Sequence, residues 1–307
     1  MIPMDTIRLR NGMSIPAIGL GPMIMNYGKA RGKRTLCKWN IPYRIWRKLQ
    51  RQLDYSRFVQ SIASGIRSGF RLIDYATAYG NLQAVGDAFL SSGLRREEIY
   101  LTGRISNRAQ FKGKNAILQE VETILKAYGT DYLDLLMFHF PVPDCYINTW
   151  KVLCELYDKG VCRSAGVANC HRHHLVNLET AGIIPMYNQI EVHPLFTNSS
   201  VVEYCASRGI VVEAYTPLAR MDDRLYRLPQ LKTIAQHHGK TTAQVVLRWH
   251  LQKKFVPCVR ALNKKHQLEA LDIFDFHLSD EEMSTIDNFN IDSRLRFDPD
   301  NCDFTIL

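Results

Sequence analysis

The chain has 307 residues, of which 46% are hydrophobic and 22% charged, so it is long enough for one large globular domain or two smaller ones. No run approaches the roughly 20 apolar residues that a membrane span needs, and residues 1–12 lack the apolar core of a signal peptide. The eight cysteines form no C-x-x-C pair, and several lie in apolar runs, as reduced core cysteines do. We therefore expect a cytoplasmic protein.

The positive charge is confined to one stretch of the chain. Between Lys29 and Arg51 there are nine basic residues and no acidic one, and the net charge of the whole chain is +9. Removing these nine from the 39 basic residues leaves 30, which equals the number of acidic residues. The basicity therefore belongs to this segment and not to the surface as a whole.

The N-terminal part predicts a hairpin, a strand and then helices. Residues 6–21 contain the turn pair Asn11-Gly12, which predicts a β-hairpin, and then a short buried strand at Ala17–Leu20. Residues 42–53 have apolar side chains at helical spacing, ending at Leu53, with basic side chains around them. Helical signals resume over residues 55–68.

From residue 70 onward, short apolar strands alternate with helical patterns. The expected strands are Leu72–Asp74, Tyr100–Thr102, Leu133–His139, Arg163–Val167, Met186–Glu191, Val211–Ala214 and Val256–Val259. The expected helices are Leu82–Leu90, Asn115–Tyr128, Asn148–Asp158, His173–Thr180, Val201–Arg208, Thr242–Gln252, Lys265–Leu271 and Ser279–Asn288. Strands without polar alternation are typical of a parallel sheet that is buried on both faces. With the early strand, eight such units predict one (β/α)8 barrel domain over residues 1–307, with a basic, partly helical insertion at about 25–55.

Polar residues gather where these strands end. They are Asp74, Tyr79, Arg104, His139, Asn169, Gln189 and Tyr215. The carboxyl ends of barrel strands meet at one mouth, where enzymes of this fold carry their chemistry. We therefore expect an acid, a phenol, a cation and an imidazole to share one site with two amides and an aromatic ring.

At these strand ends the sequence resembles the aldo-keto reductase family, over nearly the whole chain outside residues 25–55. The matching stretches are I-D-Y-A-T-A-Y-G-N at 73–81, D-Y-L-D-L-L-M-F-H-F-P-V-P at 131–143, G-V-A-N-C at 166–170, N-Q-I-E-V-H-P at 188–194, A-Y-T-P-L at 214–218 and F-D-F-H-L-S-D-E-E-M at 274–283. Six stretches in the right order and spacing make a specific signal. The resemblance implies NADPH-dependent reduction of an aldehyde or ketone to an alcohol.

The resemblance also implies roles for the residues at the mouth. Tyr79 would be the general acid that protonates the carbonyl oxygen, and His139 would orient and polarise that oxygen. A phenol with a pKa near its usual value of about 10 gives up its proton reluctantly at neutral pH, so a neighbouring cation, held by Asp74, would favour proton transfer.

The same resemblance implies how the cofactor would lie. Asn169 and Gln189 would bind the nicotinamide amide and Tyr215 would stack on its ring. Thr216 and Leu218 would be further cofactor contacts.

Two departures from the family pattern bear on activity. Arg104 stands where the family has a catalytic lysine, and a guanidinium keeps the charge but cannot give up its proton. The phosphate-binding pattern after the last strand is eroded, with Arg260 and His266 at two of its positions and Lys264 and Lys265 nearby. We therefore expect NADPH, with NADH as the alternative. A second hypothesis is an impaired reductase-like barrel that acts as a binding or regulatory module.

The remaining features have milder interpretations. His171, His173 and His174 are expected to form a solvated cluster and not a metal site, because no carboxylate or cysteine lies at ligand spacing. The basic segment is either a solvated insertion packed on the barrel by aromatic residues such as Trp39, or a cationic lid at the mouth. Such a lid would bind an anionic substrate or an acidic membrane surface. No nucleic-acid recognition motif accompanies it.

Overall fold

The computed structural model describes residues 5–23 and 43–305, with side chains in the first helix described from residue 52 onward. Eight parallel strands close into a barrel in which neighbours in sequence are also neighbours in space. They are β3 (Gly19–Leu20), β4 (Leu72–Ile73), β5 (Tyr100–Ile105), β6 (Leu135–Phe138), β7 (Ala165–Ala168), β8 (Tyr187–Glu191), β9 (Val211–Tyr215) and β10 (Val256–Val259). Pairing of Cys258 with Gly19 joins β10 to β3 and closes the ring.

The barrel strands are buried because both of their faces are covered. Every residue of β3 to β8 and of β10 is buried, with side chains of one face filling the barrel and those of the other packing on the helices. The predicted (β/α)8 fold is confirmed. The predicted hairpin is confirmed as well, with β1 (Thr6–Arg8) antiparallel to β2 (Ser14–Pro16).

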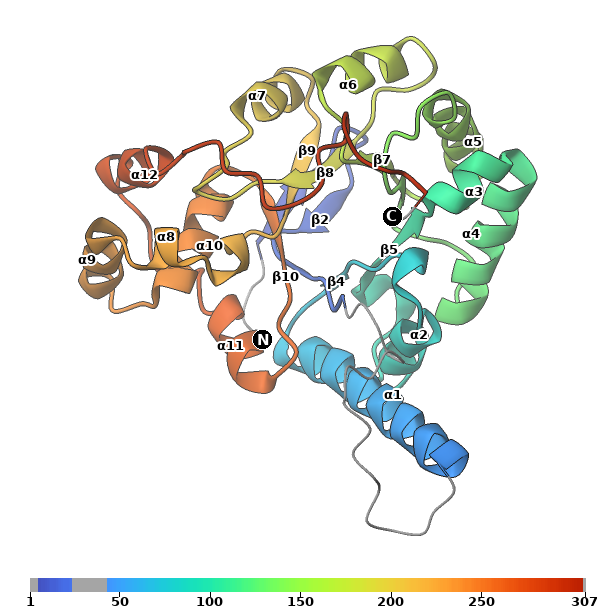
Figure 1. The fold of residues 1–307 in the computed structure, drawn as a ribbon, viewed down its shortest axis with the longest axis horizontal. Helices are drawn as coiled ribbons and strands as arrows, with labels where there is room; N and C mark the ends of the chain where they lie inside the picture. The colour runs from blue at the N-terminus through green and yellow to red at the C-terminus, as the bar shows by residue number, and fades with distance from the viewer. Residues whose placement is uncertain (1–4, 24–42, 306–307) are drawn as a thin grey trace.

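Helices surround the barrel (Figure 1). Those of the described chain are α1 (Tyr43–Ser68), α2 (Gln83–Leu90), α3 (Asn107–Lys112), α4 (Lys114–Tyr128), α5 (Tyr146–Asp158), α6 (Arg172–Glu179), α7 (Ser199–Ser207), α8 (Asp223–Tyr226), α9 (Pro229–His237), α10 (Thr242–Gln252), α11 (Lys264–Leu271) and α12 (Asp280–Asp287). None of these described helices is long and apolar enough to cross a membrane. The predicted pattern of one helix after each strand omits three helices of the structure, α3, α8 and α9. That residues 1–307 form a single domain stays a prediction.

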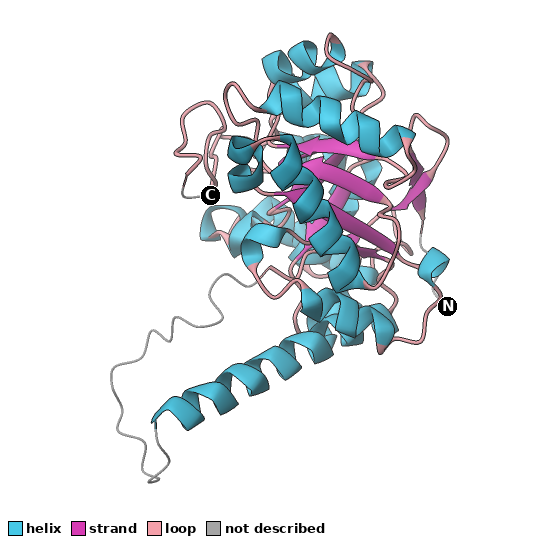
Figure 2. Cartoon of the chain, turned by 90° about the vertical axis from the view of Figure 1, so that its right-hand side faces the viewer, coloured by secondary structure: helices cyan, strands magenta, loops and turns pink. Residues whose placement is uncertain are grey.

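The helix α1 differs from what the sequence predicts. Residues 42–53 and 55–68 were expected to form separate helices, but Tyr43–Ser68 is one continuous helix of 26 residues. Figure 2 shows that its N-terminal half projects away from the barrel. Leu53 accordingly leaves 50% of its surface exposed, so the apolar face expected there is not covered at this position. Residues 24–42, including Trp39, lie outside the described residues.

After α12, residues 289–305 form a segment without helix or strand that crosses the barrel mouth; we call it the C-terminal segment (Figure 1). The carboxylate of Glu191, at the end of β8, accepts the backbone N–H groups of Leu295 and Arg296 at 2.7 and 3.0 Å. It also contacts Nε2 of His193 at 3.1 Å. At its far end, the backbone oxygen of Phe304 accepts a hydrogen bond from Asn107 at 3.2 Å.

Candidate active site

The candidate active site begins at the carboxyl ends of β4, β5 and β6. Asp74 directly follows β4, and Tyr79 ends the short 3₁₀ turn Thr77–Tyr79 behind it. Arg104 lies within β5, where its side chain points into the barrel, and His139 directly follows β6. Three adjacent strands therefore bring the four residues predicted as catalytic to one place.

A chain of polar contacts connects three of these residues. Nη1 of Arg104 donates a hydrogen bond to Oη of Tyr79 at 2.9 Å, while its Nη2 forms an ion pair with the Asp74 carboxylate. Arg104 is 3% exposed and Asp74 is 5% exposed, so a buried carboxylate fixes a buried cation against the phenol. Charge-assisted bonds in such surroundings are stronger than in water.

Asp74 is held from other sides as well. Its Oδ1 accepts a hydrogen bond from the hydroxyl of Thr102 at 2.8 Å, and its Oδ2 accepts one from Nε2 of Gln189 at 3.0 Å. Three side chains, two from β5 and one from β8, thus bind one carboxylate. Its rotamer, and with it the position of the guanidinium, is fixed by the barrel.

The electrostatics keep the phenol and the imidazole neutral. Burial raises the pKa of Tyr79 above its usual 10.0, and the neighbouring charge of Arg104 offsets part of that effect. Burial, followed by the charges of Arg104 and Arg296, lowers the pKa of His139 well below 6.5. Deeper in the barrel, burial and then the charge of Asp74 raise the pKa of Glu213 to about 8. At neutral pH the phenol therefore carries its proton while the imidazole is uncharged.

His139 completes the group beside the phenol. Its ring centroid lies 5.9 Å from that of Tyr79, with the two planes at 84°. Its Nδ1 is buried and has no hydrogen-bond partner among the described residues. An edge-on neutral imidazole beside a protonated phenol gives two groups that can both approach the oxygen of a carbonyl compound.

The residues predicted to hold the nicotinamide are linked to one another. Nδ2 of Asn169 donates to the backbone oxygen of His139 at 2.8 Å, and its Oδ1 accepts the hydroxyl of Tyr215 at 2.7 Å. Asn169 and Thr216 both have left-handed backbone angles, with φ of 59° and 55°. Leu218 lies two residues beyond Thr216, in the same turn after β9. In this structure the amide groups of Asn169 and Gln189 thus make internal hydrogen bonds.

The residues predicted for the cofactor phosphate lie after β10. Arg260 directly follows that strand, and His266 lies in the first turn of α11, where Asn263 caps the helix by accepting the His266 N–H at 2.9 Å. Arg260, Lys264 and Lys265 are exposed, and no carboxylate side chain of the chain lies within the 4.0 Å of an ion pair from any of them. This region offers free positive charge to a phosphate.

One residue near the site could not be predicted from the ends of the strands. Arg296 belongs to the C-terminal segment, yet Glu191, which accepts its backbone N–H, pairs in register with Tyr215. Burial is the largest influence on the pKa values of Tyr79, Tyr215 and His139. The charge of Arg296 partly offsets the rise that burial causes for the two phenols, and it adds to the fall for His139. No repeat or motif marks Arg296 in the sequence.

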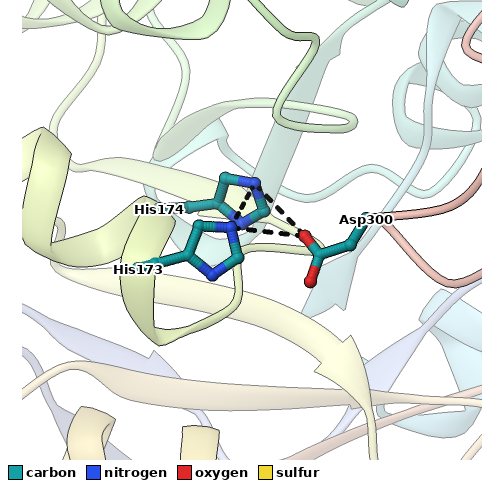
Figure 3. A group of neighbouring side chains, drawn as sticks. All are labelled: His173, His174 and Asp300. Carbon is teal, nitrogen blue, oxygen red and sulfur yellow. Dashed lines mark hydrogen bonds and ion pairs between the residues drawn. The ribbon is translucent and has the colours of Figure 1, made fainter.

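The histidine cluster after β7 differs from its prediction. Figure 3 shows His173 and His174 facing Asp300 of the C-terminal segment; the Nε2 atoms of the two rings lie 3.3 and 3.6 Å from Oδ1 of Asp300. His171 Nδ1 lies 2.7 Å from Oδ2 of the same carboxylate. The expected solvated cluster without a carboxylate is therefore wrong, because the segment that supplies Asp300 is remote in sequence.

The tautomer of His174 indicates what this cluster does. Burial, and then the neighbouring His173, lower the pKa of His174 to about 4, so the ring is neutral at pH 7. Its Nδ1 accepts the backbone N–H of His171 at 3.1 Å, which leaves the ring proton on Nε2. A protonated nitrogen offers no lone pair to a metal ion. These contacts therefore favour a hydrogen-bonded link between α6 and the C-terminal segment.

The structure is a parallel eight-stranded barrel that carries a phenol, a guanidinium, a carboxylate and an imidazole at its strand ends. This arrangement is typical of (β/α)8 enzymes. The family model described as Aldo/keto reductase family matches residues 46–291, and the chain belongs to this family. It is 36% identical to a glyoxal reductase of Bacillus subtilis, with 96% of each chain covered. It is 31% identical to the methylglyoxal reductase DkgA of Escherichia coli, again with 96% of each covered.

Solved structures agree with this assignment. An aldo/keto reductase from Brucella melitensis superimposes with a TM-score of 0.80 at 31% identity, covering 94% of this chain and 100% of that one. A Gox0644 mutant in complex with NADPH has a TM-score of 0.82 at 28% identity, covering 98% of this chain and 99% of the other.

Proposed function

We propose that the protein is an NADPH-dependent reductase that converts an aldehyde or ketone to an alcohol, with Tyr79 as the general acid. The hydrogen bond of 2.9 Å from Arg104 to the Tyr79 hydroxyl, with Asp74 behind the guanidinium, is the observation that supports it best. NADPH, when bound, supplies the hydride. Every other task falls to side chains of the chain itself.

The proposed proton transfer follows from the arrangement around Tyr79. The substrate oxygen would lie between Oη of Tyr79 and the ring of His139, and the phenolic proton would move to that oxygen as negative charge develops on it. The phenolate left behind would be stabilised by the Nη1–H of Arg104, which already points at it. Positive charge that is fixed in place beforehand needs no reorganisation during the reaction.

The second candidate function is a reductase-like barrel that binds ligands without turnover. It is motivated by Arg104, since a guanidinium cannot itself release a proton as a lysine can. Two observations weigh against it. The guanidinium still donates to the phenol, and the proton needed by the substrate is carried by Tyr79, whose pKa is raised and not lowered.

The residues present fit NADPH at both ends. Asn169, Gln189 and Tyr215 would hold the nicotinamide, with Thr216 and Leu218 beside it, as the family resemblance implies. Arg260 and His266, with the exposed Lys264 and Lys265, would face the extra phosphate. Charge-assisted hydrogen bonds to that phosphate distinguish NADPH from NADH. NADH stays the alternative, because two of the family's phosphate donors are replaced here.

The proposed substrate is a small carbonyl compound, as the names of the glyoxal and methylglyoxal reductases suggest. We place the protein in the cytoplasm, since the seven cysteines of the described part are all free thiols and such thiols persist in reducing compartments. We also propose an anionic partner for the basic segment at 29–51, either a charged substrate or an acidic membrane surface.

The test is reduction of glyoxal and methylglyoxal with NADPH or NADH, followed by cofactor absorbance, and cofactor binding followed by fluorescence. The wild type should oxidise the cofactor in both reactions. Tyr79→Phe should reduce kcat by about 10²–10⁴-fold, because only the transition state needs the phenolic proton, and should leave cofactor affinity nearly unchanged.

The control for this variant is Tyr132→Phe, which removes a phenol from the opposite, amino end of β6 and should have wild-type kcat. If Tyr79→Phe turned over as fast as the wild type, Tyr79 would not be the general acid. Cofactor binding without oxidation by the wild type would support the second candidate function.

A further inference from the structure

The C-terminal segment carries a positive charge, that of Arg296, near the candidate active site, and no Asp or Glu side chain forms an ion pair with it. The backbone at Leu295 and Arg296 is fixed by the carboxylate of Glu191, which lies at the end of β8 and is 1% exposed. Further back, the N–H groups of Ile291 and Ser293 both donate to the backbone oxygen of Leu195, at 3.3 and 3.0 Å. The segment is thus hydrogen-bonded to the barrel rim on both sides of Arg294.

Among the residues that the structure describes, the side chain of Arg296 has no ion-pair or hydrogen-bond partner. Every Asp and Glu of the sequence lies in the described part of the chain, and none has an oxygen within 4.0 Å of this guanidinium. Its guanidinium lies over the ring of Phe297, whose centroid is 5.6 Å from Cζ. The neighbouring Arg294, by contrast, stacks on Phe196 at 4.6 Å and reaches His171 at 3.3 Å. Arg296 is half-buried, and none of the five N–H donors of its guanidinium is hydrogen-bonded to a described residue.

The other charges of the site cancel or are absent. Arg104 is paired with Asp74. His139 and Tyr79 are neutral, and Glu213 with its pKa of about 8 is mostly protonated at pH 7. Glu191 has its negative charge bound by two N–H groups and His193. Neither Arg294 nor Arg296 pairs with a carboxylate of the described residues, but only the charge of Arg296 also acts on Tyr79 and His139.

We propose that Arg296 is a specificity-determining residue that binds the anionic group of a carboxylated or phosphorylated carbonyl substrate. The proposal rests on the proposed reductase function and names the substrate class of the same site. A guanidinium at the rim would bind the anion bidentately and hold the carbonyl end toward Tyr79 and His139. Its charge would act chiefly on binding, since the cation that is hydrogen-bonded to Tyr79 is Arg104.

The experiment compares matched pairs of aldehydes that differ in charge. Succinic semialdehyde and butanal test a carboxylate, and glyceraldehyde 3-phosphate and glyceraldehyde test a phosphate. Arg296→Gln should raise KM for the anionic member of one or both pairs by about ten- to a hundredfold, with kcat and both neutral aldehydes nearly unchanged. Arg296→Lys should recover part of the affinity. Arg108→Gln, which removes an exposed arginine of α3, should match the wild type.

The outcomes separate this inference from the proposed function. If the wild type reduces the neutral aldehydes but Arg296→Gln changes both members of each pair alike, Arg296 does not select anions, while the reductase function stands. Calorimetric binding of the two alcohol products, 4-hydroxybutyrate and glycerol 3-phosphate, gives a readout that needs no turnover. Equal affinity of the wild type and Arg296→Gln for both anions would overturn the inference even in a protein that reduced nothing.

Discussion

Arg104 places a full positive charge inside the barrel, where desolvation is expensive, and the structure shows how the charge is tolerated. Burial is the largest influence on its pKa and acts to lower it, but Asp74 and then Tyr79 more than offset that effect, so the pKa is raised. Its Nε has no hydrogen-bond partner among the described residues. The guanidinium is therefore held at two of its three nitrogens, by one acid and one phenol.

Substitutions at Arg104 separate the charge from the shape of the guanidinium. Arg104→Lys keeps the cation and restores the family's residue, so activity should be retained or rise. Arg104→Met leaves Asp74 buried without its cation. Removing one partner of a buried pair costs about 3–5 kcal/mol, and the free energy of unfolding should fall by that order. Turnover should fall too, because the phenolate loses its stabilising charge.

The measurements are kcat with methylglyoxal and urea unfolding of each variant. Arg95→Lys, at an exposed ion pair on the surface, serves as the control and should change neither quantity. Equal activity of the Lys and Met variants would show that the cation does not assist the phenol.

At the level of single residues, the sequence predicted which side chains of the candidate active site lie together, but it did not predict their hydrogen-bond partners. Asp74, Tyr79, Arg104 and His139 could be predicted because strand ends of a barrel must converge. The hydrogen bond from Gln189 to Asp74 could not, since it depends on rotamers set by packing across the barrel. Arg296 was also out of reach, because nothing in the sequence indicates that residues after the last helix return to the mouth.

At the level of elements, the contacts that hold the C-terminal segment include a titratable one. His174 of α6 is buried, is neutral and faces Asp300, and its pKa is lowered to about 4 from the ordinary 6.5. Between these two pH values the unfolded chain binds a proton at this position and the folded chain does not. The folded state is therefore fully favoured above about pH 6.5 and loses stability as the pH falls toward 4.

We expect His174→Asn to reduce this loss. The amide oxygen of Asn can still accept the His171 N–H but does not titrate. The variant should lose about 1–2 kcal/mol less than the wild type between pH 6.5 and 4.5, which is the order that this pKa shift implies. Urea unfolding at several pH values measures it. His277→Asn, at an exposed histidine, is the control, and parallel pH curves for wild type and His174→Asn would contradict the assignment.

The elements themselves were predictable in proportion to their length and burial. Apart from α1, which joins two predicted helices into one, the strands and the long helices show clear apolar patterns, and their positions agree with the structure to within a few residues. The helices α3 and α8 have six and four residues, too short to show a period. The helix α9 did carry a signal, with Pro229 in its first turn and Leu231, Ile234 and Ala235 buried on one side, which the sequence interpretation passed over.

At the level of the whole molecule, one segment breaks an otherwise balanced surface. Arg44, Arg47, Lys48 and Arg51 belong to the first turns of α1, the half of the helix that projects from the barrel in Figure 2. Like charges repel one another, and no acidic residue lies between Lys29 and Arg51 to relieve this. A projecting cationic helix suits attachment to an acidic surface better than contact with a small substrate inside the barrel.

The last prediction therefore concerns salt and lipid. The wild type should bind vesicles containing an anionic lipid at 0.1 M salt and be released toward 1 M, where the Debye length falls from about 10 to about 3 Å. A fourfold variant with Arg44, Arg47, Lys48 and Arg51 replaced by Gln should lose most of this binding and keep the wild-type kcat with methylglyoxal. A matched variant with Lys112, Lys126, Lys159 and Lys232 replaced by Gln has the same net charge but keeps the segment, so it should bind like the wild type.

Equal binding of both variants would mean that total charge matters and the segment does not. If no vesicle bound the wild type but the fourfold variant raised KM for glyceraldehyde 3-phosphate alone, the segment would recognise the substrate. If neither change appeared, the nine cations would belong to a structural insertion, and Arg296 would remain the anion-binding residue to test.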